Sequence, residues 1–361
     1  MNSKFTSISL FSGLGGDSLG LKQAGCEVIA YNELKPLFCT SHDANFPDSE
    51  LIHEGKVNDI SKLKDETFVK YKGKTDIIFA GFPCTSFSSA GKRKLDDPRD
   101  TLFLEFLRTT KIIQPNMIIG ENVKGLLTKK SSKGELFMDI IVEEFEKLGY
   151  NVIYQVFKCH DFNVPQSRER LIIIGIKKDN PYGWQPSFPE PLITTPNLIP
   201  IIKYDMTGAI KVNSEWFNDI PEECILTNMS DTTTYKHNNG AHPYLVSKIV
   251  AGDDEKSYNG KDYDYLFSFG KRGSPIHCEI IDIRQPSKTI ICTYEHQPRL
   301  FVPLKNQSGC YLRMLLPDEL KQIQGFPEDY KINGSTKEQI IQIGNAVPPP
   351  LIKAIVENII N

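Results

Sequence analysis

Residues 75–91 read Thr-Asp-Ile-Ile-Phe-Ala-Gly-Phe-Pro-Cys-Thr-Ser-Phe-Ser-Ser-Ala-Gly. The apolar run at the start of this stretch has the length of a buried strand, and Pro83 fixes its own φ and biases Phe82 towards extended geometry. Cys84 is therefore presented at the carboxyl end of a strand, where open α/β sheets bind their ligands. A buried structural cysteine is the commoner fate of a free thiol, so the rest of the chain has to decide between that interpretation and a nucleophile.

The first half of the chain alternates strand-like and helix-like segments. Two amphipathic stretches, Thr101–Ile113 and Glu135–Leu148, lie among short apolar runs, which predicts a mostly parallel, doubly wound, Rossmann-like α/β sheet. A loop too short for a crossover helix joins the last two runs, so we expect them to form an antiparallel pair at one edge. The predicted strands are Ile8–Phe11, Val28–Tyr31, Ile77–Ala80, Met117–Ile119, Val152–Phe157 and Leu171–Ile176.

The pattern changes near Asn180, where five prolines cluster around Trp184. From there to about Phe301 the βα alternation is lost, and Asn, Thr, Tyr, His, Gly and Lys are frequent. We therefore expect a smaller, loop-rich, β-containing domain over 186–324. The final predicted helix is short for an independent unit, so the first domain should be discontinuous, over 1–185 and 325–361. Later helices are expected at Pro317–Gln324, Lys337–Gln342 and Leu351–Ile360.

Composition narrows the class of protein. The net charge of the 361 residues is −3, so no global basic field indicates a nucleic-acid partner, and any such binding needs local patches. The eight cysteines form no C-x-x-C pair, so we expect no metal site and a reduced, cytoplasmic environment. The apolar run near the N-terminus is broken by Gly13, and no stretch is long enough to predict a signal peptide or a membrane span.

A glycine loop, Phe11-Ser-Gly-Leu-Gly-Gly16, follows the first predicted strand. Glycines let the backbone approach a ligand, and the next helix can face a charged group with its N-terminus. The loop is not a clean G-x-G-x-x-G, which counts against a nicotinamide cofactor. Glu33 closes the second strand, where it could accept hydrogen bonds from ribose hydroxyls or cap a helix. Asp59 could bind an adenine amino group or cap the helix expected at Ser61.

Glu121 interrupts an apolar passage at the end of another predicted strand. Burying a carboxylate is costly unless something binds it, so Glu121 is a candidate for donating or sharing a proton; a solvated strand-end acid is the alternative. Farther along, Arg168 and Arg170 alternate in Gln-Ser-Arg-Glu-Arg and should point to one face of an extended segment. Either could bind a phosphate or a planar acceptor through two hydrogen bonds, or form a surface pair with Glu169.

Six motifs fall in one order along the chain, and this order resembles that of the DNA (cytosine-5)-methyltransferase family, in particular its bacterial, restriction-modification-like members. The resemblance covers nearly the whole chain except about 181–283, and the family's variable target-recognition region lies at the same place. The motifs are Phe-Ser-Gly-x-Gly-Gly at 11–16, Pro-Cys at 83–84, Glu-Asn-Val at 121–123, Gln-x-Arg-x-Arg at 166–170, Arg-x-Pro-Ser-x-Thr at 284–289 and Gly-Asn-Ala-Val-Pro-Pro at 344–349.

The resemblance implies a fold, a reaction and a set of roles. The sheet would be that of an S-adenosylmethionine-dependent methyltransferase, and the second domain would recognise the target. Cys84 would add to C6 of a cytosine flipped out of double-stranded DNA, so that C5 accepts a methyl group from S-adenosyl-L-methionine, with Glu121 and Arg168 as the other catalytic residues. The cofactor-binding residues would be Phe11, Ser12, Gly13, Gly15, Gly16, Glu33, Asp59, Pro83, Leu102, Asn345 and Val347.

DNA contacts are expected beside the Pro-Cys loop, where basic residues cluster, as they do again at 124–133. A monomer should suffice for an asymmetric target, and a cognate restriction endonuclease could act on the same site without being a bound subunit. Thr85 stands where many relatives have Gln, which concerns local DNA contacts and not the chemistry. The expected DNA-binding residues are Ser88, Lys92, Arg93, Arg99, Arg170 and Arg284.

Three other functions remain open at this point. A tRNA cytosine-5 methyltransferase would share these motifs, although a sizeable second domain favours the reading of a DNA sequence. A nicotinamide-dependent oxidoreductase would use the same kind of sheet, but the imperfect glycine pattern and the Pro-Cys and Glu-Asn-Val loops count against it. A catalytically inactive DNA-binding module would tolerate the loss of the Cys84 thiol.

Overall fold

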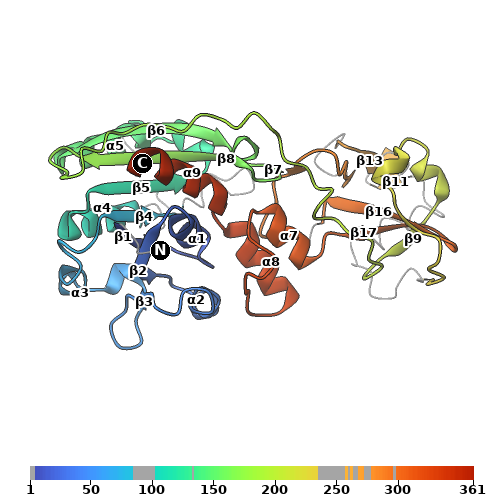
Figure 1. The fold of residues 1–361 in the computed structure, drawn as a ribbon, viewed down its shortest axis with the longest axis horizontal. Coiled ribbons are helices and arrows are strands. Elements are labelled where there is room, and N and C mark those ends of the chain that lie inside the picture. Colours follow the sequence, from blue (N-terminus) through green and yellow to red (C-terminus); the bar gives the residue numbers. More distant parts are fainter. Residues whose placement is uncertain are drawn as a thin grey trace.

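The computed structural model describes residues 5–83, 102–131, 134–234, 257–258, 261–262, 267–271, 278–295 and 298–361. Cys84 lies outside the described residues, as do Ser88, Lys92, Arg93 and Arg99. The molecule is elongated, with a large sheet at one end and a second sheet at the other (Figure 1).

The large sheet has seven strands in the order β3-β2-β1-β4-β5-β8-β6, and β1 to β5 run parallel. β8 is antiparallel to both β5 and β6, and β6 is the last strand in this order and forms one edge of the sheet. The predicted doubly wound sheet and its antiparallel edge pair are confirmed. The strands are β1 (Phe5–Leu10), β2 (Cys26–Asn32), β3 (Glu50–Leu51), β4 (Ile77–Ala80), β5 (Met117–Asn122), β6 (Tyr150–Lys158) and β8 (Glu169–Lys177).

Helices cover both faces of this sheet because successive strand residues point to opposite sides. Ile77 and Phe79 belong to the core cluster that includes α1 and α9, whereas Ile78 and Ala80 belong to the cluster that includes α3, α4 and α5. The C-terminal helix thus returns to the first sheet, as the sequence predicts. The helices are α1 (Gly16–Gln23), α2 (Pro36–Asp43), α3 (Asp65–Val69), α4 (Leu102–Ile113), α5 (Phe137–Lys147) and α9 (Pro349–Ile360).

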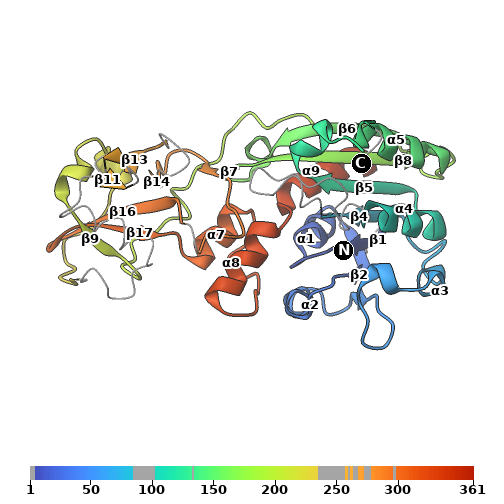
Figure 2. The same cartoon turned by 180° about the vertical axis from the view of Figure 1, so that it is seen from behind.

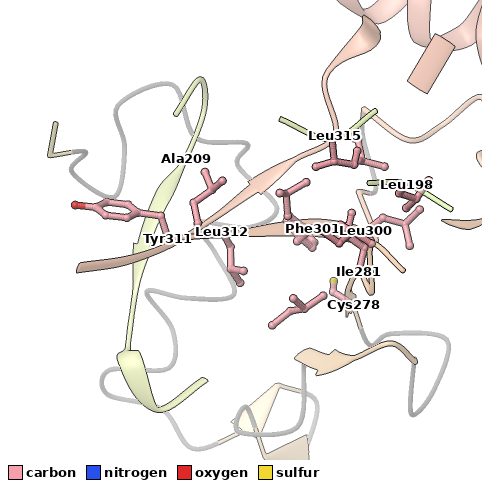
Figure 3. Close-up of a cluster of buried hydrophobic side chains, with 14 of the residues drawn as sticks. Leu198, Ala209, Cys278, Ile281, Leu300, Phe301, Tyr311, Leu312 and Leu315 are labelled. Atoms are coloured by element: carbon pink, nitrogen blue, oxygen red, sulfur yellow. The ribbon is translucent and has the colours of Figure 1, made fainter. Parts of the chain in front are cut away.

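The second sheet is built around β16 and β17, which form an antiparallel pair. Figure 3 shows Leu300, Phe301 and Leu312 from this pair packed with Cys278 and Leu198. The apolar side chains on these short strands bury one another, so the smaller domain has its own core. The strands of this sheet are β9 (Ile210–Val212), β10 (Leu226–Asn228), β13 (Phe267–Phe269), β14 (Cys278–Ile280), β16 (Leu300–Asn306) and β17 (Gly309–Met314). Two further pairs of short strands lie outside both sheets: β11 (Ser257–Tyr258) with β12 (Lys261–Asp262), and β7 (Gln166–Ser167) with β15 (Ser287–Lys288).

Two helices, α7 (Pro317–Ile323) and α8 (Thr336–Asn345), lie between the sheets (Figure 2). Ile340 and Ile343 of α8 pack into the core of the second sheet, whereas Ile352 and Ile355 of α9 pack into that of the first. The change from one core to the other therefore falls between α8 and α9. The predicted boundary near residue 325 stays a prediction. In the part of the chain that the structure describes, no helix has the length and apolar character needed to cross a bilayer.

Candidate active site

The motifs that follow the parallel strands converge at one edge of the large sheet. Leu10, the last residue of β1, is in register with Asn32 on one side and Ala80 on the other, and Ala80 is in register with Gly120. Neighbouring strands lie about 4.8 Å apart, so the loops that leave them are adjacent. The glycine loop, Glu33, Pro83 and Glu121 therefore meet at this carboxyl edge, where such sheets bind ligands.

Glu33 anchors the glycine loop. Its Oε2 accepts a hydrogen bond from the Gly13 N–H at 2.9 Å, and its Oε1 accepts one from the Lys35 N–H at 2.8 Å. Burial raises the pKa of Glu33, although these N–H groups oppose the shift. The loop itself needs left-handed backbone, with φ of 57° at Phe11 and 92° at Gly15. The carboxylate thus holds a strained loop while each oxygen keeps a second lone pair for a ligand.

Asp59 follows Asn58, whose Nδ2 donates to the Glu33 backbone carbonyl at 2.8 Å. The Asp59 carboxylate caps the short 3₁₀ helix Ile60–Lys62 by accepting from the Ser61 N–H at 3.2 Å and hydroxyl at 2.7 Å. The capping role considered from the sequence is therefore present, and the adenine contact stays a prediction. Leu102 begins α4 and packs at the margin of the adjoining core.

The C-terminal motif lies against the glycine loop. A Cβ on Gly16 would collide with the Val347 carbonyl oxygen, so only glycine permits this approach. A Cβ on Gly81 would lie 3.6 Å from a Val347 methyl group, which places Val347 between the first and fourth strands' loops. Asn345 is exposed at the end of α8. The fold thus brings Val347 to the predicted cofactor site, and its contact with a cofactor stays a prediction.

Glu121 forms an ion pair with Arg170 across β5 and β8. Arg170 Nε donates to Glu121 Oε1 at 2.7 Å, and the two side chains are only 13% and 11% exposed. A largely buried guanidinium beside a carboxylate fixes the orientation of the acid as well as its charge. Arg170 was expected among the DNA-binding residues; the structure places it against the predicted catalytic acid.

Asn122 links Glu121 to the approach to Cys84, a role that the sequence did not reveal. Its Nδ2 donates to the Phe82 carbonyl at 3.0 Å, and its Oδ1 accepts from the Val123 N–H at 2.8 Å. Both Asn122 and Phe82 are buried. The amide therefore fixes the backbone two residues before Cys84 to the strand that carries Glu121. The presence of an amide between Glu121 and Val123 was the available signal.

Arg168 lies in the seam between the two cores and is 3% exposed. Its guanidinium donates to the carbonyls of Ile290 at 3.2 Å, Gly344 at 3.3 Å and Ala346 at 3.4 Å. Burial, with a contribution from Arg170, lowers the pKa of Arg168 to about 9. These bonds join segments far apart in the sequence, and a contact with the target base stays a prediction.

The buried amide of Gln166 strengthens the same seam. Its Nε2 donates to Gln324 Oε1 at 2.6 Å, and its Oε1 accepts from the Ile290 N–H at 2.9 Å. Gln324 in turn donates to the Ala346 carbonyl at 2.5 Å. Gln166 and Arg168 of this motif therefore connect the segment around Ile290 to the C-terminal motif through buried side chains.

Arg284 and two lysines near Glu121, Lys124 and Lys129, have protein partners. Arg284 binds Asp282 through two hydrogen bonds of 2.9 Å and pairs with Glu223 at 2.7 Å, within the second domain. Lys124 pairs with Glu169 at 3.2 Å, and the buried Lys129 lies 4.4 Å from the centre of the Phe137 ring. The DNA contact of Arg284 stays a prediction, and it requires exchange of an existing ion pair.

Asp17, also missed from the sequence, is a buried acid directly beneath the glycine loop. It lies in the first turn of α1 and accepts a hydrogen bond from the Ser9 hydroxyl. Burial raises its pKa from 3.8 to about 7, and Glu121 contributes in the same direction. The position immediately after Gly15-Gly16 was the signal that could have identified it.

Comparisons with known proteins identify the family of this chain. The family model for C-5 cytosine-specific DNA methylase matches residues 5–361. Type II methyltransferase M1.HphI of Haemophilus parahaemolyticus is 32% identical, over 98% of this chain and 86% of that protein. Type II methyltransferase M.PspPI of a Psychrobacter strain is also 32% identical, over 99% of this chain and 79% of that protein.

Solved structures share the fold over nearly the whole chain. A mutant of Spodoptera frugiperda DNMT2 superposes with a TM-score of 0.63 and 18% identity, covering 97% of this chain and 98% of that one. The Entamoeba histolytica methyltransferase EhMeth superposes with a TM-score of 0.63 and 16% identity, covering 98% and 97% of the two chains. At these identities the likeness concerns the fold alone.

Proposed function

Because this chain belongs to the C-5 cytosine-specific DNA methylase family and is a DNA cytosine-5 methyltransferase, we propose that it methylates a cytosine within a specific double-stranded DNA sequence by covalent addition of Cys84 to C6. The observation that carries the proposal is the tether between Asn122 and the Phe82 carbonyl, 3.0 Å long. It joins the backbone leading to Cys84 to the strand that carries Glu121, and both residues have to act on the same ring.

The residues at the carboxyl edge fit S-adenosylmethionine, which when bound supplies the methyl group. The glycine loop, held open by Glu33, offers close backbone approach, and the Glu33 oxygens retain lone pairs for ribose hydroxyls. Asp59 follows Asn58, which binds the Glu33 backbone carbonyl, and it offers a carboxylate for the adenine amine. Val347 closes the same region from the C-terminal side. Binding of S-adenosylhomocysteine would test this assignment without requiring turnover.

Cys84 raises the reactivity of cytosine by forming a bond between its sulfur and C6. The electrons of the C5–C6 double bond then move towards C5 and the ring nitrogen N3. Glu121, oriented by Arg170, donates or shares a proton at N3 and so neutralises the charge that develops there. After C5 has been alkylated, a base, for which water is our candidate, removes the C5 proton. The sulfur–C6 bond then breaks, the double bond is restored and the thiolate leaves.

A cytosine stacked in a duplex exposes neither face of its ring, so we propose that the target base is flipped out before attack. The two cores would frame the duplex, and the second would read the sequence. A monomer would suffice, and a cognate restriction endonuclease would act on the same site without being a bound subunit. The type II names of the similar methyltransferases support this last point.

DNA carrying 5-fluorocytosine at the target tests the covalent step. Fluorine cannot leave C5 as the proton does, so we expect a complex between enzyme and DNA that survives denaturation. Methylation of ordinary DNA without trapping would contradict the mechanism. Transfer of labelled methyl to tRNA in place of duplex DNA would contradict the substrate.

A further inference from the structure

The loop of residues 326–334, here called the tyrosine loop, connects α7 to α8 and packs against the N-terminal part of the chain beside the large sheet. Its flanking helices pack into the core of the second sheet through residues such as Ile323 and Ile340. Phe326 and Tyr330, in contrast, form a separate buried cluster with Leu14 of the glycine loop and other first-domain residues. The tyrosine loop is therefore a bridge from the second core to the predicted cofactor site.

Tyr330 makes the central contact of this bridge. Its hydroxyl donates to the Leu14 carbonyl at 2.6 Å and lies 3.4 Å from the Gly15 carbonyl. The side chain is 5% exposed, and its ring packs on Phe326 at a centroid distance of 4.7 Å. A Cβ on Gly15 would lie 2.9 Å from the Tyr330 hydroxyl, so the ring occupies the space directly against this glycine.

The hydroxyl controls two peptide planes of the glycine loop. A peptide unit is planar, so fixing the Leu14 carbonyl fixes the Gly15 N–H, which donates to the Ser12 carbonyl at 2.9 Å. The Gly15 carbonyl shares its plane with the N–H of Gly16, the first residue of α1. Gly15 has a φ of 92°, and glycine has weak torsional preferences, so an external contact is needed to hold one loop conformation.

Other bonds hold the tyrosine loop in place. Lys321 of α7 is buried, and its Nζ donates to the Glu328 carbonyl at 2.6 Å and the Tyr330 carbonyl at 3.2 Å. On the first-domain side, Asn45 exchanges two hydrogen bonds with the Lys331 backbone, at 2.8 and 3.0 Å. Tyr330 is thus fixed from both cores and is not a side chain that happens to touch a loop.

We propose that Tyr330 is a positioning residue for the methyl-donor loop, through which the core of the second sheet sets the affinity for S-adenosylmethionine. The inference rests on the proposed function, since it assigns the glycine loop to the methyl donor. Tyr330 itself touches neither the donor nor the reacting atoms. It acts on donor binding by selecting the loop conformation, and the chemistry of Cys84 is left to other residues.

The test compares Tyr330→Phe with Tyr150→Phe. Tyr150 is equally buried and donates to the Pro115 carbonyl at 2.7 Å, at the opposite edge of the sheet. Both variants lose one buried hydrogen bond, but only Tyr330→Phe loosens the glycine loop. We expect the dissociation constant for S-adenosylhomocysteine, measured by calorimetry without DNA, to rise about fivefold in Tyr330→Phe, the factor that one hydrogen bond is worth, and to stay unchanged in Tyr150→Phe.

Steady-state kinetics supply the second readout. For Tyr330→Phe, we expect KM for the methyl donor to rise while kcat and KM for DNA hold. Lys321→Met, which releases the carbonyl of Tyr330 without touching its hydroxyl, should raise the donor KM in the same direction. Wild-type donor affinity in Tyr330→Phe, or equal losses in Tyr330→Phe and Tyr150→Phe, would overturn the inference. Wild-type enzyme that binds no S-adenosylhomocysteine would instead overturn the proposed function, and this inference with it.

Discussion

Replacing Asn122 with alanine tests whether one amide side chain aligns the approach to Cys84. The Nδ2 group donates to the Phe82 carbonyl at 3.0 Å, and the Oδ1 atom accepts from the Val123 N–H at 2.8 Å. Phe82 and Asn122 are buried, so water does not readily replace the lost partner. The variant therefore loses two hydrogen bonds and leaves a buried carbonyl unsatisfied.

The stability cost follows from these two bonds. At a net value of about 1 kcal/mol each, their loss lowers the free energy of unfolding by about 2 kcal/mol. The effect on chemistry should be larger, because a displacement of about 1 Å at a reacting group can cost about 100-fold in rate. Only Pro83 lies between Phe82 and Cys84. We therefore expect covalent trapping to slow by about 100-fold while the affinity for S-adenosylhomocysteine is retained.

The assay is the rate of covalent trapping on duplex DNA carrying 5-fluorocytosine, at saturating methyl donor. Asn116→Ala is the matched control, because Asn116 precedes the same strand and donates to Asp76 at 3.1 Å, at the other end of the sheet. Denaturant unfolding should confirm that both variants are folded. Trapping by Asn122→Ala at the wild-type rate, despite its lost stability, would refute the role we give to the tether. So would an equal slowing in Asn116→Ala.

Cys84→Ser should abolish methyl transfer and trapping but leave S-adenosylhomocysteine binding intact; residual transfer at the wild-type rate would exclude Cys84 as the nucleophile. Burial raises the pKa of Asp17 from 3.8 to about 7, so between these two pH values the folded protein holds a proton that the unfolded chain has lost. The free energy of unfolding therefore falls as the pH rises from 3.8 to about 7. The stability of the wild type relative to Asp17→Asn, measured by urea unfolding, should accordingly be lower at pH 8 than at pH 5. Arg168→Met should lower the free energy of unfolding by about 2 to 4 kcal/mol because its carbonyl partners stay buried, whereas Arg284→Met, on the surface, should change it little. Equal losses in the two variants, measured by urea unfolding, would show that the buried hydrogen bonds of Arg168 stabilise the fold no more than the surface contacts of Arg284.

The sequence predicted the sheet because its physical signals are local. Alternating apolar runs and amphipathic stretches define strands and helices within about ten residues, so β4 and α4 could be placed from residues 77–113 alone. The same locality placed Glu33 and Glu121 at strand ends. Convergence at one edge then follows from parallel pairing and needs no knowledge of side-chain contacts.

The partners of the candidate site residues could not be predicted in this way. Arg168 binds the Gly344 carbonyl across 176 residues, and Gln166 binds Gln324 across 158. Such pairs depend on how the second domain is threaded back to the first, which no local pattern encodes. The pair of Arg170 with Glu121 comes nearer to what a sequence can predict, because antiparallel pairing of β5 with β8 brings the two residues together. That register was not available from the two apolar runs.

The packing of α9 on α1 sets an order of events during protein synthesis. A Cβ on Gly20 of α1 would lie 2.6 Å from the Pro349 carbonyl, so the two helices touch backbone to backbone. The ribosome makes α1 early and α9 only after the whole second domain. Until Pro349–Ile360 has been made, Leu21 of α1 lacks the apolar side chains of α9 that share its core cluster, and the glycine loop lacks its Val347 neighbour. We therefore expect the glycine loop to reach its final packing only after α9 has been made.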